Sequence, residues 1–162
     1  MELTLHLPEN HHFIRSVTDK GFHVNEVEYE GAIIVSARTV IPSWTAKSIK
    51  ALTESELQPL FELEPEIVLL GTGRDQLFPD PSQMMSFYRR GNGIEAMTTR
   101  AACRTFNVLM SEGRNAVAAM LPAGSRAQAT EGGAVLPQAK KRVLKAVVRA
   151  AAFRRRREQG SE

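Results

Sequence analysis

Hydrophobic and polar positions alternate along the first forty residues with the two-residue period of short β-strands. Residues 13–17 form one such segment, and residues 22–24 and 27–29 form two more, separated by an Asn-Glu pair that favours a tight turn. Residues 32–35 are continuously apolar and mostly β-branched, which is typical of a buried strand. Pro42 ends this β-rich part. The pattern therefore predicts several short strands, two of them joined as a hairpin.

After residue 50 the apolar positions take up the spacing of a helix. Thr53 and Glu56 are placed to form a capping box, in which each side chain bonds the backbone N–H of the other residue. Leu57, Leu60 and Phe61 follow as one apolar face. The sequence therefore predicts a short helix that begins after Thr53 and is stopped by Pro65.

Strands and helices then alternate to residue 121. Residues 66–70 are a short apolar run, which is typical of a strand buried on both faces. The further elements that we expect are a helix over residues 82–90, a strand over 94–97, a helix from Thr98 or Thr99 to Glu112, and a strand over 115–121. A β-rich start followed by this alternation predicts a single compact α/β domain, residues 1–122, with helices packed on a mixed sheet.

Residues 123–162 differ from the rest of the chain in composition and charge. This segment holds ten Lys or Arg and three Asp or Glu, a balance of +7, whereas residues 1–122 carry −4. Residues 123–138 are rich in Gly, Ala, Ser and Gln, which predicts a flexible linker, and residues 139–162 predict a basic, partly helical or disordered tail. The basic isoelectric point therefore belongs to the tail and not to the domain.

The composition also narrows the class of protein. No apolar run reaches the roughly 20 residues that a membrane-spanning helix needs. Cys103 is the only cysteine, so no intramolecular disulfide can form. The first residues carry an early acid and lack the pattern of a secretory or organelle signal. We expect a cytoplasmic protein, with the tail as the element that would bring it to the inner face of a membrane.

The first candidate site is the loop after the strand of residues 66–70. Ligands of open α/β sheets bind beyond the C-terminal ends of strands, and glycines let an anion approach backbone N–H groups. Neither the dinucleotide fingerprint nor the phosphate-binding loop motif is complete here. The alternative is that the glycines only turn the chain and permit close packing. The candidate residues are Gly71, Thr72, Gly73, Arg74 and Asp75.

The second candidate site is the start of the helix at Thr98. Free N–H groups and the helix dipole favour a negative ligand at this point, and two arginines one turn apart would reinforce that preference. The alternative is ordinary capping by threonine beside solvated arginines. The candidate residues are Thr98, Thr99, Arg100, Arg104 and Asn107.

Other reactive side chains give weaker signals. Arg100 and Arg104 flank Cys103 and would lower the pKa of its thiol, but a cysteine in an Ala-rich helix is more often a small packed residue. Glu95 is a lone strand carboxylate and a weak candidate for a general base. The four histidines all precede residue 24, and their placement does not favour a shared metal. We therefore predict no catalytic residue, metal or cofactor.

The basic tail is the third candidate. Its cations would bind anionic lipid headgroups or nucleic-acid phosphates, and the alternative is a solvated, partly disordered segment. Phe153 is the only aromatic residue of the tail, so base stacking is poorly supported and nucleic acid is the less favoured partner. The residues concerned are Lys141, Lys145, Arg149, Arg154, Arg155, Arg156 and Arg157.

Four stretches of the domain resemble a known family. They are residues 22–36, 66–73, 93–107 and 114–120, of which the block Thr-Arg-Ala-Ala-Cys-Arg-Thr-Phe-Asn is the most specific. Together they are similar to a small family of unknown function that includes bacterial and archaeal proteins and the mitochondrial complex I assembly factor 3. The resemblance implies a compact α/β domain with a β-rich N-terminal half and no established catalytic residues. It does not extend to the tail.

These observations lead to three hypotheses about function. The first is a non-enzymatic binding or assembly protein resembling complex I assembly factors, with a respiratory-complex subunit as a conceivable protein partner and a tail that contacts an acidic surface. The second is a small-molecule or anion-binding enzyme that uses the loop of residues 71–75 and the start of the Thr98 helix. The third is nucleic-acid binding through the tail. The sequence alone does not give the oligomeric state.

Overall fold

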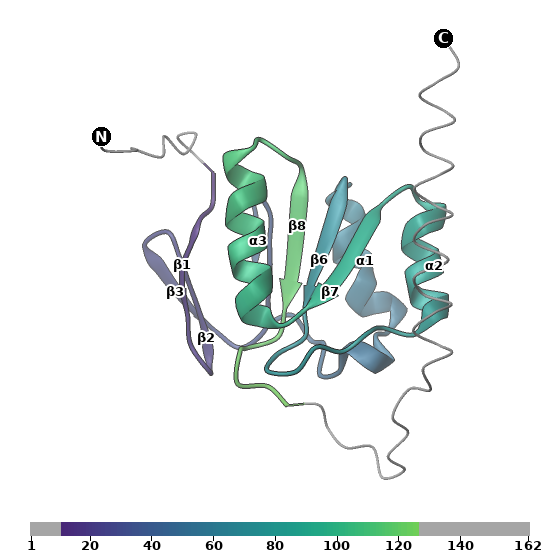
Figure 1. Cartoon of the computed structure of the whole chain (residues 1–162), viewed down its shortest axis with the longest axis horizontal. Coiled ribbons are helices and arrows are strands. Elements are labelled where there is room, and N and C mark those ends of the chain that lie inside the picture. The colour runs from purple at the N-terminus through teal and green to yellow at the C-terminus, as the bar shows by residue number, and fades with distance from the viewer. Residues whose placement is uncertain (1–10, 127–162) are drawn as a thin grey trace. The chain divides into compact units, whose positions relative to one another are not determined.

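The computed structural model of the chain describes residues 11–126, which contain two β-sheets and three α-helices (Figure 1). The first sheet is antiparallel, in the order β1-β2-β3, with β1 at Ile14–Val17, β2 at Gly21–Val24 and β3 at Val27–Glu30. Strands β2 and β3 form the predicted hairpin, and Asn25 in its turn has φ 50°. Asparagine tolerates this left-handed conformation better than most residues, which explains the tight turn.

The second sheet is mixed and has the strand order β5-β4-β8-β6-β7. Strand β6 runs parallel to both β7 and β8, whereas β4 is antiparallel to β8 and to β5. This confirms the predicted mixed sheet; only β5 and a short 3-10 helix (Ile49–Ala51) were not predicted, since neither segment is long enough to show a period. The strand bounds are Ile33–Val35 for β4, Val40–Ile41 for β5, Ile67–Gly71 for β6, Gly93–Met97 for β7 and Ala116–Met120 for β8.

The three helices are α1 (Glu54–Glu62), α2 (Pro81–Arg89) and α3 (Thr99–Ser111). The Thr53 hydroxyl accepts a hydrogen bond from the N–H of Glu56, whose carboxylate accepts one from the N–H of Thr53, so the predicted capping box is present. Asp80 caps α2 and Thr98 caps α3. The helix starts follow from local side-chain chemistry, which is why the sequence predicts them closely.

Helix α3 lies between the two sheets and packs on β6, β8 and β1 (Figure 1). Its buried face carries Ala102, Phe106 and Met110, which join apolar side chains of both sheets in one core. Helix α1 lies behind the strands in Figure 1 and packs on α2, where the Phe61 and Phe87 rings are 4.9 Å apart. The three-stranded sheet is therefore attached to the domain through α3.

The connections around β6 change direction within the mixed sheet. The chain leaves β6 through α2 to reach β7 on one side, and then returns through α3 to β8 on the other side of β6. Because crossovers between parallel strands are right-handed, the loops after β6 and β7 are expected to lead to helices on opposite faces of the sheet. This is the point at which open α/β sheets usually bind their ligands.

The chain continues along the domain beyond β8. The N–H of Leu121 donates to the carbonyl of Gly71, and the N–H of Gly124 donates to that of Asp19, at 2.9 and 3.1 Å. Gly124 belongs to the segment that the composition predicts as a linker; the remainder of that prediction, from residue 127, and the tail lie outside the described residues. Within residues 11–126, no helix is both long and apolar enough to span a membrane.

Candidate functional site

The loop after β6 and the start of α3, which the sequence offers as separate candidates, lie side by side at the end of the mixed sheet. Thr72 N–H donates to the carbonyl of Met97 at 2.8 Å, and Thr99 N–H donates to that of Gly73 at 3.0 Å. The N–H of Gly73 in turn donates to the Thr99 hydroxyl at 2.9 Å. The parallel pairing of β6 and β7 thus brings the two candidates together.

The polar groups at this end of the sheet are satisfied by the chain itself. The Thr99 hydroxyl donates to the carbonyl of Leu121 at 2.6 Å, and the N–H of Arg74 donates to that of Ser125 at 2.8 Å. Thr99 and Thr72 are 0% and 1% exposed. The N–H groups of residues 72–74 that an anion would use therefore already have partners, and we call this region the closed end of the sheet.

Close packing explains both glycines of the loop. A Cβ on Gly71 would lie 2.7 Å from the Cγ of Met120, and a Cβ on Gly73, whose φ is +90°, would overlap the carbonyl oxygen of Ser125. At contacts this short, neighbouring atoms would have to move before either position could carry a side chain. The side chains of Arg74 and Asp75 are exposed. Ligand binding by this loop stays a prediction, and it would depend on these two exposed side chains or on displacement of the Ser125 segment.

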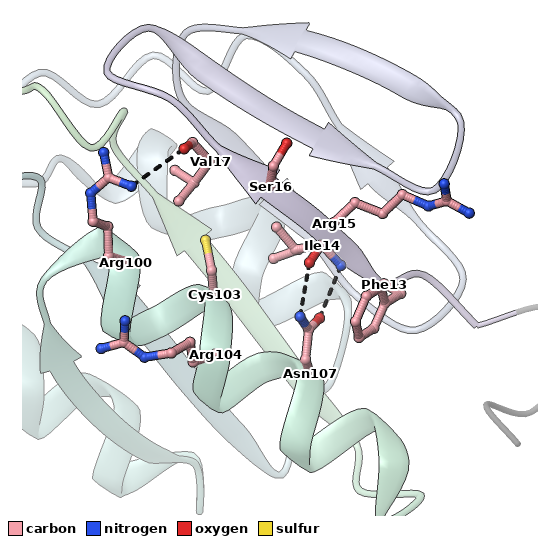
Figure 2. A pocket seen from close by; sticks show the side chains of 9 residues that line it. All are labelled: Phe13, Ile14, Arg15, Ser16, Val17, Arg100, Cys103, Arg104 and Asn107. Carbon is pink, nitrogen blue, oxygen red and sulfur yellow. Dashed lines mark hydrogen bonds between the residues drawn. The ribbon is translucent and has the colours of Figure 1, made fainter. Parts of the chain in front are cut away.

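Arg100, Arg104 and Asn107 do not belong to the closed end. They line a pocket of about 240 Å³ between β1 and α3, where Cys103 forms part of the floor (Figure 2). Figure 2 shows the two arginines projecting from the same side of α3, while Cys103 and Asn107 point toward β1. The remaining lining residues are the consecutive positions Phe13, Ile14, Arg15, Ser16 and Val17.

Asn107 fixes the strand that forms the other wall of this pocket. Its side-chain oxygen accepts a hydrogen bond from the N–H of Ile14 at 2.9 Å, and its side-chain nitrogen donates to the carbonyl of Ile14 at 2.8 Å. The amide therefore takes the place of a neighbouring strand at the free edge of β1. Arg100 adds a weaker link through the carbonyl of Val17 at 3.4 Å and the carboxylate of Asp19 at 3.5 Å.

The pocket carries positive charge without an acid in its lining. Three of its nine lining residues are arginines and none is Asp or Glu. Arg15 pairs with Glu26 at 3.0 Å, and Arg100 pairs with Asp19. Within residues 11–126, the side chain of Arg104 makes neither a hydrogen bond nor an ion pair. Its exposed guanidinium therefore has no counter-charge among the described residues.

Cys103 is a packed thiol and not an activated nucleophile. Burial raises the pKa of its thiol to about 12, which outweighs the opposing effect of Arg100 and Arg104. Its Sγ lies 3.6 Å from the Sδ of Met120 in the core. The thiol therefore stays protonated at neutral pH, in agreement with the interpretation that this cysteine is a small packed residue.

The other candidates from the sequence are dispersed. Glu95 is exposed on β7, and the ring of His12 hydrogen-bonds through Nδ1 to the carbonyl of Ser36 at 2.9 Å. No group of three or more His, Cys, Asp or Glu is placed to hold a metal ion in the described part of the chain. The basic residues of the tail, from Lys141 to Arg157, lie outside it.

The sequence missed that residues 13–17 form a wall of a pocket. It showed this segment as a strand, but nothing in the local pattern places a strand beside a helix that begins more than eighty residues later. The only signal was Asn107, a polar residue next to the apolar face of its helix. A side chain that can both donate and accept in such a place indicates that a backbone edge lies opposite.

Comparison with known proteins gives a match over most of the domain. Residues 14–121 match the model of a family described as "Protein of unknown function (DUF498/DUF598)". A 13 kDa major membrane protein of Francisella tularensis is 31% identical over 64% of this chain and 85% of its own length. The mouse NADH dehydrogenase [ubiquinone] 1 alpha subcomplex assembly factor 3 is 34% identical over 68% of this chain, and the match covers 60% of that protein's length.

Solved structures agree with this match. A crystal structure of a Bordetella parapertussis protein has a TM-score of 0.65 and 37% identity, over 71% of this chain and 98% of that one. A Bartonella henselae protein described as an outer membrane protein has a TM-score of 0.62 and 26% identity, over 72% and 98% of the two chains. The fold described above is therefore shared with solved proteins along nearly their whole length.

Proposed function

The chain belongs to the DUF498/DUF598 family of proteins of unknown function, and from this premise we propose that its domain binds a protein partner and assists the assembly of a larger complex without catalysing a reaction. The proposal is supported by relatives that are named for this role, such as the mouse assembly factor. Because this chain matches only 60% of that factor's length, the partner itself does not carry over. A subunit of a respiratory complex is the class of partner that the relationship favours.

The observation that carries the proposal is the closure of the sheet end where a fold of this kind would hold a substrate. The N–H groups of Thr72, Gly73 and Arg74 are all bonded within the chain, and the Thr99 hydroxyl beside them is fully buried. An enzyme of this architecture would need that space for its ligand. A pocket that stays open among the described residues, between β1 and α3, has a volume of about 240 Å³, and this small size favours a group presented by another protein.

The direct test is recovery of a defined partner by the full-length chain at its native expression level. Cells are cross-linked briefly, the tagged chain is purified, and enriched proteins are quantified against a tagged protein of equal size. We expect one complex or subunit to be enriched and the interaction to be reproduced with the two purified proteins. If no purified protein binds while a metabolite raises the melting temperature, the proposal is wrong.

We further propose that the basic tail holds the domain near an acidic surface such as an anionic membrane. Its charge of +7 supports this. Each cation near an anionic leaflet contributes about 1 kcal/mol. We expect the chain to sediment with phosphatidylglycerol vesicles at low salt, and replacement of Arg154, Arg155, Arg156 and Arg157 by Gln to release it. Unchanged sedimentation of this variant would refute the role of the tail.

Two alternatives give different results in the same experiments. A small-molecule or anion-binding enzyme at the closed end predicts that phosphorylated metabolites raise the melting temperature and that an Arg74→Glu change abolishes this effect. A nucleic-acid binder predicts retardation of DNA or RNA by the full chain, with an affinity that falls steeply as salt increases. Neither has a specific observation among the described residues in its favour.

A further inference from the structure

We infer that the pocket between β1 and α3 receives an acidic side chain of the protein partner, with an apolar neighbour of that residue resting on the rim. This inference rests on the proposed function and adds to it the place of binding and the chemistry that is recognised. Nothing in the closed end or the tail enters the argument. It stands on the charge, the size and the rigidity of the pocket.

The charge of the pocket selects an anion. No acidic residue lines it, and Arg104 has no partner within residues 11–126. Arg100, one helical turn earlier, is held only by two long contacts of 3.4 and 3.5 Å, the second to a largely exposed carboxylate. A carboxylate between the two guanidiniums would replace long contacts by short, charge-assisted ones. Arginine is also better suited than lysine to planar, two-point recognition of a carboxylate.

The size and the walls of the pocket favour a side chain of the partner over a cofactor as its ligand. Its volume of about 240 Å³ is below the range of roughly 300–1,000 Å³ that is usual for small-molecule sites. Phe13, Ile14 and Val17 supply apolar surface beside the arginines, which suits the methylene stem of a glutamate. A nucleotide or a flavin would exceed this space, whereas one glutamate and part of an adjacent leucine would fill it.

The pocket is held in its open shape before a ligand arrives. The two hydrogen bonds of Asn107 fix the edge of β1, and Ile14 beside them is buried in the core that includes α3. A site whose walls are fixed loses little conformational entropy on binding. The pocket therefore has the rigidity expected of a docking site that recognises one side chain of a flexible partner segment.

The test titrates the ¹⁵N-labelled full chain with acetyl-Leu-Glu-Leu-amide and with the matched peptide that carries Gln in place of Glu. We expect the Glu peptide to shift the amide signals of Ser16, Val17, Cys103 and Arg104 in a saturable manner, and the Gln peptide to bind at least about ten-fold more weakly. Equal binding of both peptides, or shifts confined to other parts of the domain, would overturn the inference.

Three surface variants separate the pocket from general charge effects. Arg104→Glu is expected to weaken binding of the Glu peptide at least about ten-fold, and Arg104→Lys to weaken it less, since a lysine keeps the charge but not the two-point geometry. The control is Arg89→Glu, the same change on the exposed end of α2, for which we expect less than a two-fold effect. Similar losses in Arg104→Glu and Arg89→Glu would also contradict the inference.

A final comparison uses hexanoate, which offers the same carboxylate and apolar stem as a free acid. Hexanoate binding more tightly than the Glu peptide at these signals would overturn the assignment to a partner's side chain, and weaker binding supports it.

The same variants then distinguish this inference from the proposed function. If the purified partner binds Arg104→Glu as well as the unchanged chain, the docking place is wrong and the assembly role stands; if no partner exists, the assembly role itself fails.

Discussion

The closed end of the sheet and the β1–α3 pocket both use polar residues from the first turns of α3, yet their chemistry is opposite. At the closed end, Thr99 is fully buried, and its hydroxyl accepts a hydrogen bond from the N–H of Gly73 and donates one to the carbonyl of Leu121. At the pocket, Arg104 is exposed and has no partner within the described residues. A hydrogen-bonding residue near a strand end is therefore not by itself a ligand site. What matters is whether the chain already satisfies it.

Helical geometry explains how neighbouring residues come to serve two regions. With 3.6 residues per turn, Thr99 and Ala102 face the mixed sheet, whereas Arg100, Cys103, Arg104 and Asn107 recur on the flank that meets β1. The block of sequence that carries the family resemblance therefore has one half in the core and the other at the pocket. Three substitutions test this division.

The largest effect is expected from Gly73→Ala at the closed end. A Cβ at this position would overlap the Ser125 carbonyl and would also require an L-residue at φ +90°. Together these terms should lower the free energy of unfolding by about 3 kcal/mol. Gly91→Ala is the matched control, because its φ is +77° but its Cβ would meet nothing, so about 1 kcal/mol is expected. Equal losses in urea denaturation would show that the closed end is not tightly packed.

A smaller effect is expected from Asn107→Leu at the pocket wall. The change leaves the N–H and the carbonyl of Ile14 without their partner and should cost about 2 kcal/mol. Hydrogen exchange at the Ile14 amide should accelerate more than exchange in β6. Asn107→Asp keeps the acceptor and loses the donor, so its exchange rate at Ile14 should lie between those of the unchanged protein and of Asn107→Leu. An unchanged exchange rate at Ile14 would mean that α3 does not hold the edge of β1.

The smallest effect concerns the pocket floor and depends on pH. Burial raises the pKa of Cys103 from 9.0 to about 12, so its protonated form stabilises the fold below pH 9 and this contribution is lost as pH rises toward 12. Between pH 8 and pH 10 the loss should be about 1 kcal/mol. Cys103→Ala should remove this part of the pH dependence, which urea denaturation of both proteins at the two pH values measures. If the free energy of unfolding changed equally with pH in both proteins, the thiol would have to be in contact with solvent.

Much of the architecture could be predicted from the sequence because it depends on neighbours in the chain. The hairpin around Asn25 and the capping box of Thr53 and Glu56 were predicted and are present, and the predicted cap at Thr98 or Thr99 is Thr98. The two residues of β5 were missed, since so short a strand exists only through its pairing with β4. Ligand binding by the candidate residues stays a prediction. Arg100, Arg104 and Asn107 were grouped with the helix start, and in the structure they line a pocket together with a strand from the other end of the domain.

The period of each element, the ends of the helices, the separate charge of the tail and the family could all be recognised from the order of residues alone. These features follow from local side-chain chemistry or from patterns that survive without knowledge of the fold. Only the tertiary structure decided that Ser125 and Leu121 close the sheet end, and that Asn107 clamps the edge of β1. Whether a polar group is free or satisfied depends on partners that are distant in the sequence. That dependence is why one of two similar candidate regions is closed and the other is open.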